Sequence, residues 1–264
     1  MKTLLTILIF LMSAGAATAT ENELPVDYNA SQIVTSVVRL HIQADKNRPK
    51  HLRELDTPRN QNEFDVTKYF EVFKHISPPE GHVLDYVYSM DIIGGRPFLY
   101  LHEAREIPFK TFSDYEKALG GIKKVSETER CMPTRLRLDG SAESFFEQFV
   151  FDILAGQFYL YWHANYNDSV IITTADDLEH LFKEIDKDDF GQPLTDEQKT
   201  AARKVDLTPR VVFRSDKIAE VSIVIFSKWG GLDRVTRSVA RTYPHVFKNI
   251  KVEKLVSYDC GMMF

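Results

Sequence analysis

Pairs of strand-like segments joined by short turns constrain the fold of this chain most strongly. Residues 83–90 and 97–102 are rich in aromatic and aliphatic side chains, and Gly94–Gly95 stands between them. A glycine pair between two such runs is typical of a β-hairpin, whose strands are antiparallel. Residues 210–214 and 219–226 form a second pair around a short polar turn. The sequence therefore predicts antiparallel sheet.

Helical segments flank these hairpins. Ser, Thr and Asp begin helices well, because their side-chain oxygens accept hydrogen bonds from the first free N–H groups. Helices are predicted to begin at Asp65, Thr111 or Ser113, Ser141, Thr174 and Thr195, with another over residues 232–243. Further strands are predicted over residues 33–42, 135–138, 158–166, 170–173 and 250–256. The turn Asn167–Asp168 would join two of these strands into a third hairpin.

From residue 64 onwards these elements recur three times as helix, strand, strand, helix. The units are too few and too irregular for a solenoid. We therefore predict the α+β class, with antiparallel sheet or sheets built from repeated helix-hairpin-helix units and helices mainly covering one face. Two arrangements fit: one continuous sheet, or two adjacent units over residues 20–125 and 126–264 with a linker at 123–129.

The first 19 residues predict export. Lys2 is followed by an apolar run over residues 4–12 and by small residues that end with Ala17–Thr18–Ala19. This order is typical of a secretory signal peptide that is cleaved after Ala19. The apolar run is shorter than the roughly 20 residues that a membrane span needs. No cysteine stands at the cleavage region for a lipid anchor. We expect a secreted or periplasmic protein without a membrane span.

Charge and motifs narrow the classes of partner. The chain has 33 Lys and Arg against 38 Asp and Glu, a net charge of −5. This balance excludes a protein whose main task is to bind nucleic-acid phosphates. The motifs of serine hydrolases, zinc proteases and phosphate-binding loops are absent from the sequence, so no cofactor is predicted.

Export affects how the two cysteines are interpreted. In an oxidising compartment Cys131 and Cys260 could form one disulfide that ties the end of the chain to its middle. The alternative is two separate buried thiols, because a disulfide needs Cα atoms within about 4.4–6.8 Å, and the sequence does not fix that distance.

Tyrosines and histidines that alternate along predicted strands are the candidate binding residues. They are Tyr86, Tyr88, Tyr100, His102, Tyr159, Tyr161 and His163. Alternation places them on the side opposite Leu99 and Leu101, so helices over the aliphatic side would leave an aromatic face exposed. Tyrosine offers a large contact area at low entropic cost, which suits a protein, peptide or glycan partner. The alternative is that these residues belong to the core, since aromatic side chains favour strands.

Two groups of residues in the sequence are candidates for a metal site. His41, His102 and His163 all lie in predicted strands, but none of them stands at the short spacing of zinc motifs. Residues 186–197 resemble a calcium loop in spacing, yet Phe190 occupies a position that needs an oxygen ligand. A solvated acidic turn explains that segment without a metal. No metal site is predicted.

Together these features predict a non-enzymatic binding or interaction protein that uses the tyrosine-rich sheet face. The alternative is a hydrolase of an extracellular or envelope polymer. In that case two of the carboxylates of Asp85, Asp91 and Glu103 would share the acid and base steps.

Overall fold

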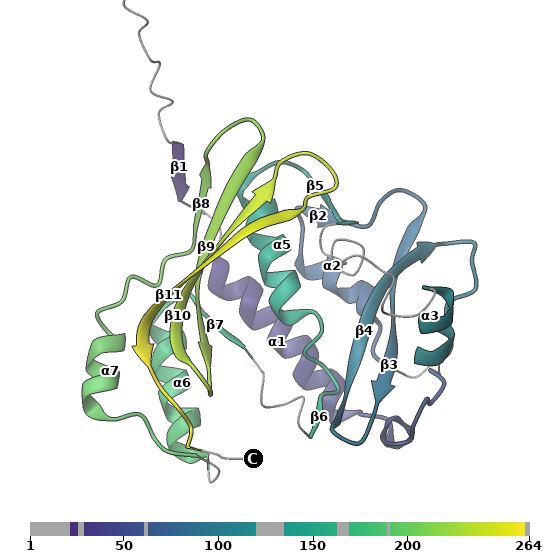
Figure 1. Ribbon diagram of the computed structural model, residues 1–264, viewed down its shortest axis with the longest axis horizontal. Coiled ribbons are helices and arrows are strands. Elements are labelled where there is room, and N and C mark those ends of the chain that lie inside the picture. The colour runs from purple at the N-terminus through teal and green to yellow at the C-terminus, as the bar shows by residue number, and fades with distance from the viewer. Residues whose placement is uncertain are drawn as a thin grey trace, which may run out of the picture.

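The computed structural model describes residues 22–25, 29–60, 63–119, 135–162, 169–188 and 191–261. The expected signal segment 1–19, the linker 123–129, Cys131 and His163 lie outside these ranges. The described chain is a mixed α+β structure with antiparallel sheets (Figure 1). The fold class is therefore confirmed at this level.

The largest sheet is built mainly from the C-terminal third of the chain. Its strands are β1 (Asn22–Pro25), β7 (Val170–Ile172), β8 (Arg210–Phe213), β9 (Ile218–Ser227), β10 (Gly231–Ala240) and β11 (Phe247–Ser257). Their order is β1-β8-β9-β10-β11, and β7 also pairs with β9. One end of β9 pairs with β8 and the other with β7, so both strands lie on the same side of β9.

Two smaller sheets complete the strand structure. The first, in the order β3-β4-β6, contains β3 (His82–Met90), β4 (Gly94–Glu103) and β6 (Tyr161–Trp162). The second pairs β2 (Ile76–Ser77) with β5 (Arg137–Leu138). The predicted hairpins β3–β4 and β8–β9 are thus confirmed.

The helices do not gather on one face. They are α1 (Ala30–Lys46), α2 (Tyr69–Val72), α3 (Phe112–Ala118), α5 (Ala142–Leu154), α6 (Ala175–Lys187) and α7 (Asp196–Ala202), with 3₁₀ helices over Lys50–Arg53 and Val66–Lys68. In Figure 1, α1 and α5 lie between the large sheet and the β3–β4 hairpin, and α6 and α7 lie at one end of the large sheet. Within the described residues, no helix is both long and apolar enough to span a membrane.

The large sheet separates two apolar cores. Val221 and Ile223 of β9 face the larger core, which contains Phe145 and Phe149 of α5. Val224, on the opposite side of the same strand, faces a smaller core. That core also contains Leu178, Phe182, Leu232 and Val256. Residues 223–226 of β9 are buried on both sides, and all four of them are apolar.

The predicted strand over residues 33–42 is wrong, because these residues form the middle of α1. The side chain of Asn29 accepts a hydrogen bond from Gln32 N at 3.1 Å and caps the helix. The buried side chains recur every three or four positions, at Ile33, Val34, Val37, His41 and Ala44. This helical period outweighs the strand preference of the β-branched residues.

Two further predictions are corrected at the C-terminal side. Residues 232–243, predicted as a helix, belong largely to β10, which pairs along its length with β9. The predicted hairpin between residues 158–166 and 170–173 is not seen in its described part, residues 158–162 and 170–173, because β6 pairs with β4 and β7 pairs with β9. The regular helix-hairpin-helix repeat is therefore not seen.

Candidate functional site

The register of β3–β4 separates the predicted tyrosines. Tyr86 lies opposite Leu99, and Tyr100 lies opposite Asp85. Directly opposed residues of an antiparallel pair share a face. Tyr86 and Tyr88 therefore share the face of Leu99, whereas Tyr100 and His102 lie on the other face.

Tyr86, Tyr88 and Tyr159 come together inside the larger core and are buried. The Tyr88 hydroxyl donates to Tyr159 O at 2.7 Å, and the rings of Tyr86 and Tyr159 pack on Phe158 at 4.9 and 5.3 Å between centroids. Burial raises the pKa of Tyr88 to about 12. These tyrosines fill the core, as the alternative interpretation of the sequence expected.

The second tyrosine group lies under α3. The ring centroid of Tyr100 is 5.1 Å from that of Phe109 and 5.4 Å from that of Tyr115. His102 lies beside Tyr100, at 5.7 Å between ring centroids. Tyr100 is buried, which raises its pKa to about 12. Tyr161 is half-buried beneath the Arg53 guanidinium, and His163 is not described. The candidate residues thus do not form one exposed face.

The carboxylates of Asp85, Asp91 and Glu103, which are the candidates for hydrolysis, interact with nearby groups of the protein and not with one another. Asp85 forms an ion pair with Arg59 and lies 3.8 Å from His102 Nε2. The Asp91 side chain accepts hydrogen bonds from two backbone N–H groups in the β3–β4 turn. Glu103 pairs with Arg105 at 2.6 Å. These contacts hold the hairpin together and do not assemble a pair of free carboxylates.

The expected metal ligands are also dispersed or paired. His41 lies on α1, where its Nε2 is 2.8 Å from the Tyr69 hydroxyl. In the segment resembling a calcium loop, Asp186 pairs with Lys199 and Asp188 pairs with Lys228. Among the described residues, no group of three or more His, Cys, Asp or Glu side chains could hold a metal ion. Cys260 is buried, and its disulfide with Cys131 stays a prediction because Cys131 is not described.

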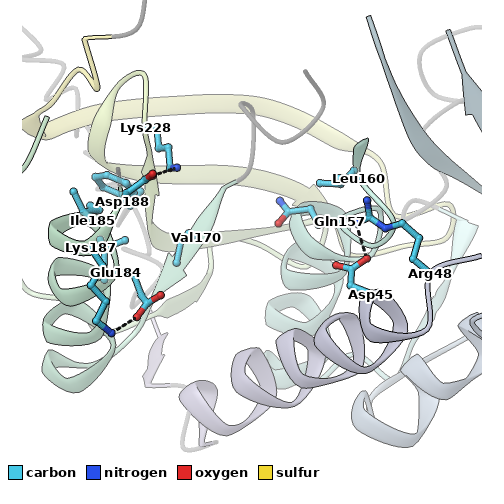
Figure 2. Close-up of a pocket in the computed structure, with 12 residues that line it drawn as sticks. Asp45, Arg48, Gln157, Leu160, Val170, Glu184, Ile185, Lys187, Asp188 and Lys228 are labelled. Carbon is cyan, nitrogen blue, oxygen red and sulfur yellow. Dashed lines mark hydrogen bonds and ion pairs between the residues drawn. The ribbon is translucent and has the colours of Figure 1, made fainter. Parts of the chain in front are cut away.

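A groove of about 620 Å³, which no sequence pattern predicts, lies between two parts of the molecule (Figure 2). On one side stand α6, β7 and the end of β9, and on the other stand the C-terminal ends of α1 and α5. We define the groove by its lining residues, which are Asp45, Arg48, Gln157, Leu160, Val170, Leu181, Glu184, Ile185, Lys187, Asp188, Phe226 and Lys228. These residues come from segments far apart in the sequence, so no local motif marks the site.

The groove combines apolar side chains with ion pairs. Its apolar side chains are Leu160, Val170, Leu181, Ile185 and Phe226. Three ion pairs surround them: Arg48–Asp45, Lys187–Glu184 and Lys228–Asp188. Each charged lining residue thus has a partner within the protein, and all six side chains remain partly exposed to solvent.

Three helices end at this groove. Asp45 and Arg48 lie at the end of α1, Gln157 follows α5, and Glu184 and Asp188 lie in and after the last turn of α6. The C-terminal end of a helix carries a partial negative charge of about half an elementary charge, because its last carbonyl groups lack helical partners. The groove is therefore an environment that favours positive charge.

No family model, curated protein or solved structure matches this chain. The groove must accordingly be judged by its own geometry.

Proposed function

We propose that the chain is an exported, non-enzymatic binding protein whose groove holds an organic cation with an apolar body. This proposal rests on one observation: apolar side chains and the C-terminal ends of three helices lie together in one groove. A volume of about 620 Å³ lies within the range of roughly 300–1,000 Å³ for small-molecule sites.

The ion pairs support a cationic ligand. Asp45, Glu184 and Asp188 pair with Arg48, Lys187 and Lys228, so each carboxylate that lines the groove has a counter-ion. A ligand ammonium group can replace one of these side-chain cations, which then turns into solvent. The exchange conserves charge, and burial of the ligand's apolar body supplies the driving force.

The carboxylates of the groove support binding without chemistry, because each of them is held in an ion pair with a lysine or arginine. Export is the part of the proposal that rests on residues 1–19 alone. Amino-terminal sequencing of the exported protein should begin at Thr20, and a protein that still begins Met1–Lys2 would contradict it.

Three indole compounds test the ligand class, because they share one ring system and differ in charge. Tryptamine is a cation, tryptophol is neutral and indole-3-acetate is an anion. Protein purified after expression of the full chain is titrated with each compound, and its melting temperature is recorded, since a ligand of the native state raises it. We expect tryptamine to give the largest rise and indole-3-acetate none. Equal rises with all three compounds, or none with tryptamine, would contradict the proposal.

Variants on α6 locate the binding site. Glu184→Gln removes a carboxylate of the groove, while Glu179→Gln on the same helix removes one that pairs with Arg203 outside it. We expect Glu184→Gln to weaken tryptamine binding several-fold and Glu179→Gln to leave it unchanged. Equal effects of the two variants would place the ligand elsewhere.

A further inference from the structure

Strand β11 is a long edge strand that no other described strand covers. It pairs with β10 on one side, and among the described residues no strand pairs with its other side (Figure 1). All residues from 248 to 254 are exposed. The free edge of β3 differs, because Arg59 donates to Tyr86 O there and pairs with Asp85. Within the described residues, one sheet edge is thus covered and another is left open.

The open edge carries exposed apolar side chains. Ile250 and Val252 are 61% and 59% exposed. They are two residues apart on one strand and therefore point to the same face. A strand added to β11 would cover both side chains and would satisfy the free backbone groups of the edge.

The same strand is basic within an acidic protein. Residues 247–257 contain three Lys against one Glu, although the whole chain has a net charge of −5. Lys254 pairs with Asp233. Lys248 and Lys251 form no ion pair with any described residue and are exposed. The edge therefore has positive charge available for a partner.

This pattern of lysines opposes one register of pairing with a second copy of the chain. Lys248 and Lys254 are placed symmetrically about Lys251. Two antiparallel copies of β11 centred on this residue would put Lys251 opposite itself and Lys248 opposite Lys254. Like charges directly opposed across strands destabilise the pair. Lysine on an edge also protects against self-association, and an acidic partner removes that repulsion.

We propose that β11 is a docking edge for an extended acidic segment of a partner protein, in which acidic and apolar side chains alternate. The segment adds as a strand to the large sheet. Its apolar residues cover Ile250 and Val252 on one face, and its carboxylates meet Lys251 on the other. This surface is separate from the groove, so the two proposals can fail independently.

The test uses two fluorescein-labelled nine-residue peptides, one of alternating Glu and Val and one of alternating Lys and Val. Fluorescence anisotropy at 50 and 300 mM NaCl gives their affinities. We expect the acidic peptide to bind, with affinity at least five-fold weaker at the higher salt, and the basic peptide not to bind. Equal binding of the two peptides, or no binding of the acidic one, would overturn the proposal.

Variants and hydrogen exchange distinguish strand addition from general charge attraction. Lys251→Glu should weaken binding at least ten-fold, whereas Lys217→Glu in the β8–β9 turn should leave it unchanged. The acidic peptide should also slow amide exchange within residues 248–254. A uniform effect of both variants, unchanged exchange, or a peptide-free dimer that Lys251→Glu dissociates would overturn the assignment. Glu184→Gln, the groove variant, should bind the peptide as the wild type does.

Discussion

The Tyr86 hydroxyl donates a hydrogen bond to Glu63 Oε2 at 2.7 Å, which ties the segment before α2 to the free edge of β3. The Glu63 side chain is fully buried and also lies 2.9 Å from His51 Nε2 and 3.3 Å from Arg59 Nε. The Arg59 guanidinium lies 3.9 Å from the centroid of the Tyr86 ring. The buried Glu63 carboxylate thus holds in place the residues that cover the free edge of β3.

Replacing Glu63 with Gln should destabilise the protein by about 2 kcal/mol, because Tyr86 and Arg59 lose a charged acceptor. Arg59 keeps its ion pair with Asp85. Tyr86→Phe removes one hydrogen bond and should cost about 1 kcal/mol, although its partner carboxylate keeps other donors. Urea unfolding at pH 7 measures both values. A Glu63→Gln protein that unfolds at the wild-type urea concentration would show that the network contributes little.

His41 should make stability depend on pH. Burial lowers the pKa of this histidine from 6.5 to about 4, against the opposing effect of the Asp45 carboxylate. Below pH 6.5 the unfolded chain binds a proton that the folded chain does not, so stability falls as the pH drops from about 6.5 to 4. The shift corresponds to a loss of about 3 kcal/mol.

Urea unfolding at pH 7, 5.5 and 4 tests this dependence. The variant His41→Gln keeps a donor for the Tyr69 hydroxyl and has no titrating group. Its stability should change less than that of the wild type over this interval. Parallel curves for the two proteins would assign the pH dependence to other groups.

Asp177 joins the start of α6 to the rest of the molecule. Its carboxylate accepts hydrogen bonds from Thr173, Thr174 and Ser31. Burial alone would raise its pKa, but these hydrogen bonds lower it overall. Stability from this carboxylate is therefore present above its ordinary pKa and is lost as the pH falls through the lowered value.

Asp177→Asn should destabilise the protein by about 1–2 kcal/mol at pH 7, since a charged acceptor that completes a capping box is lost. Thermal unfolding at pH 7 and pH 3 checks the sign. The difference between variant and wild type should shrink at the lower pH, and a growing difference would contradict the assignment.

Local signals in the sequence predicted those elements whose cause lies within a few residues. Thr111, Ser141, Thr174 and Thr195 each cap the helix predicted after them, because a cap depends only on the next turn of chain. The β3–β4 hairpin was likewise marked by its own turn region. Such signals act over short distances along the chain, so a single sequence is enough to predict these elements.

The strand register and the pairing of distant segments could not be predicted from the sequence in the same way. Alternation along β3 and β4 was predicted correctly, but the pairing of Tyr86 with Leu99 depends on how the two strands align. A shift of one residue moves every side chain to the other face. The groove needs four or more segments to meet, so Asp45 and Lys228 could not be linked before the fold was known.

Gly231 is the first residue of β10 and lies against the backbone at the end of β11. Its φ of +87° lies in the region that favours glycine, and an added Cβ would lie 2.6 Å from Tyr258 N and in collision with Val256 O. Both neighbours are backbone atoms, in β11 and directly after it, so they cannot move away as a flexible side chain could. Gly231→Ala should therefore cost about 3 kcal/mol.

Gly230→Ala is the matched control. Its Cβ would lie 3.1 Å from Ser227 Oγ and 3.2 Å from Lys254 Nζ, and both of these side chains can move. It should cost less than about 1 kcal/mol. Because this turn also holds Lys228 at the groove, Gly231→Ala should weaken tryptamine binding even at a temperature where the variant is folded. Equal melting temperatures for the two variants would show that the β9–β10 turn tolerates a side chain at either glycine.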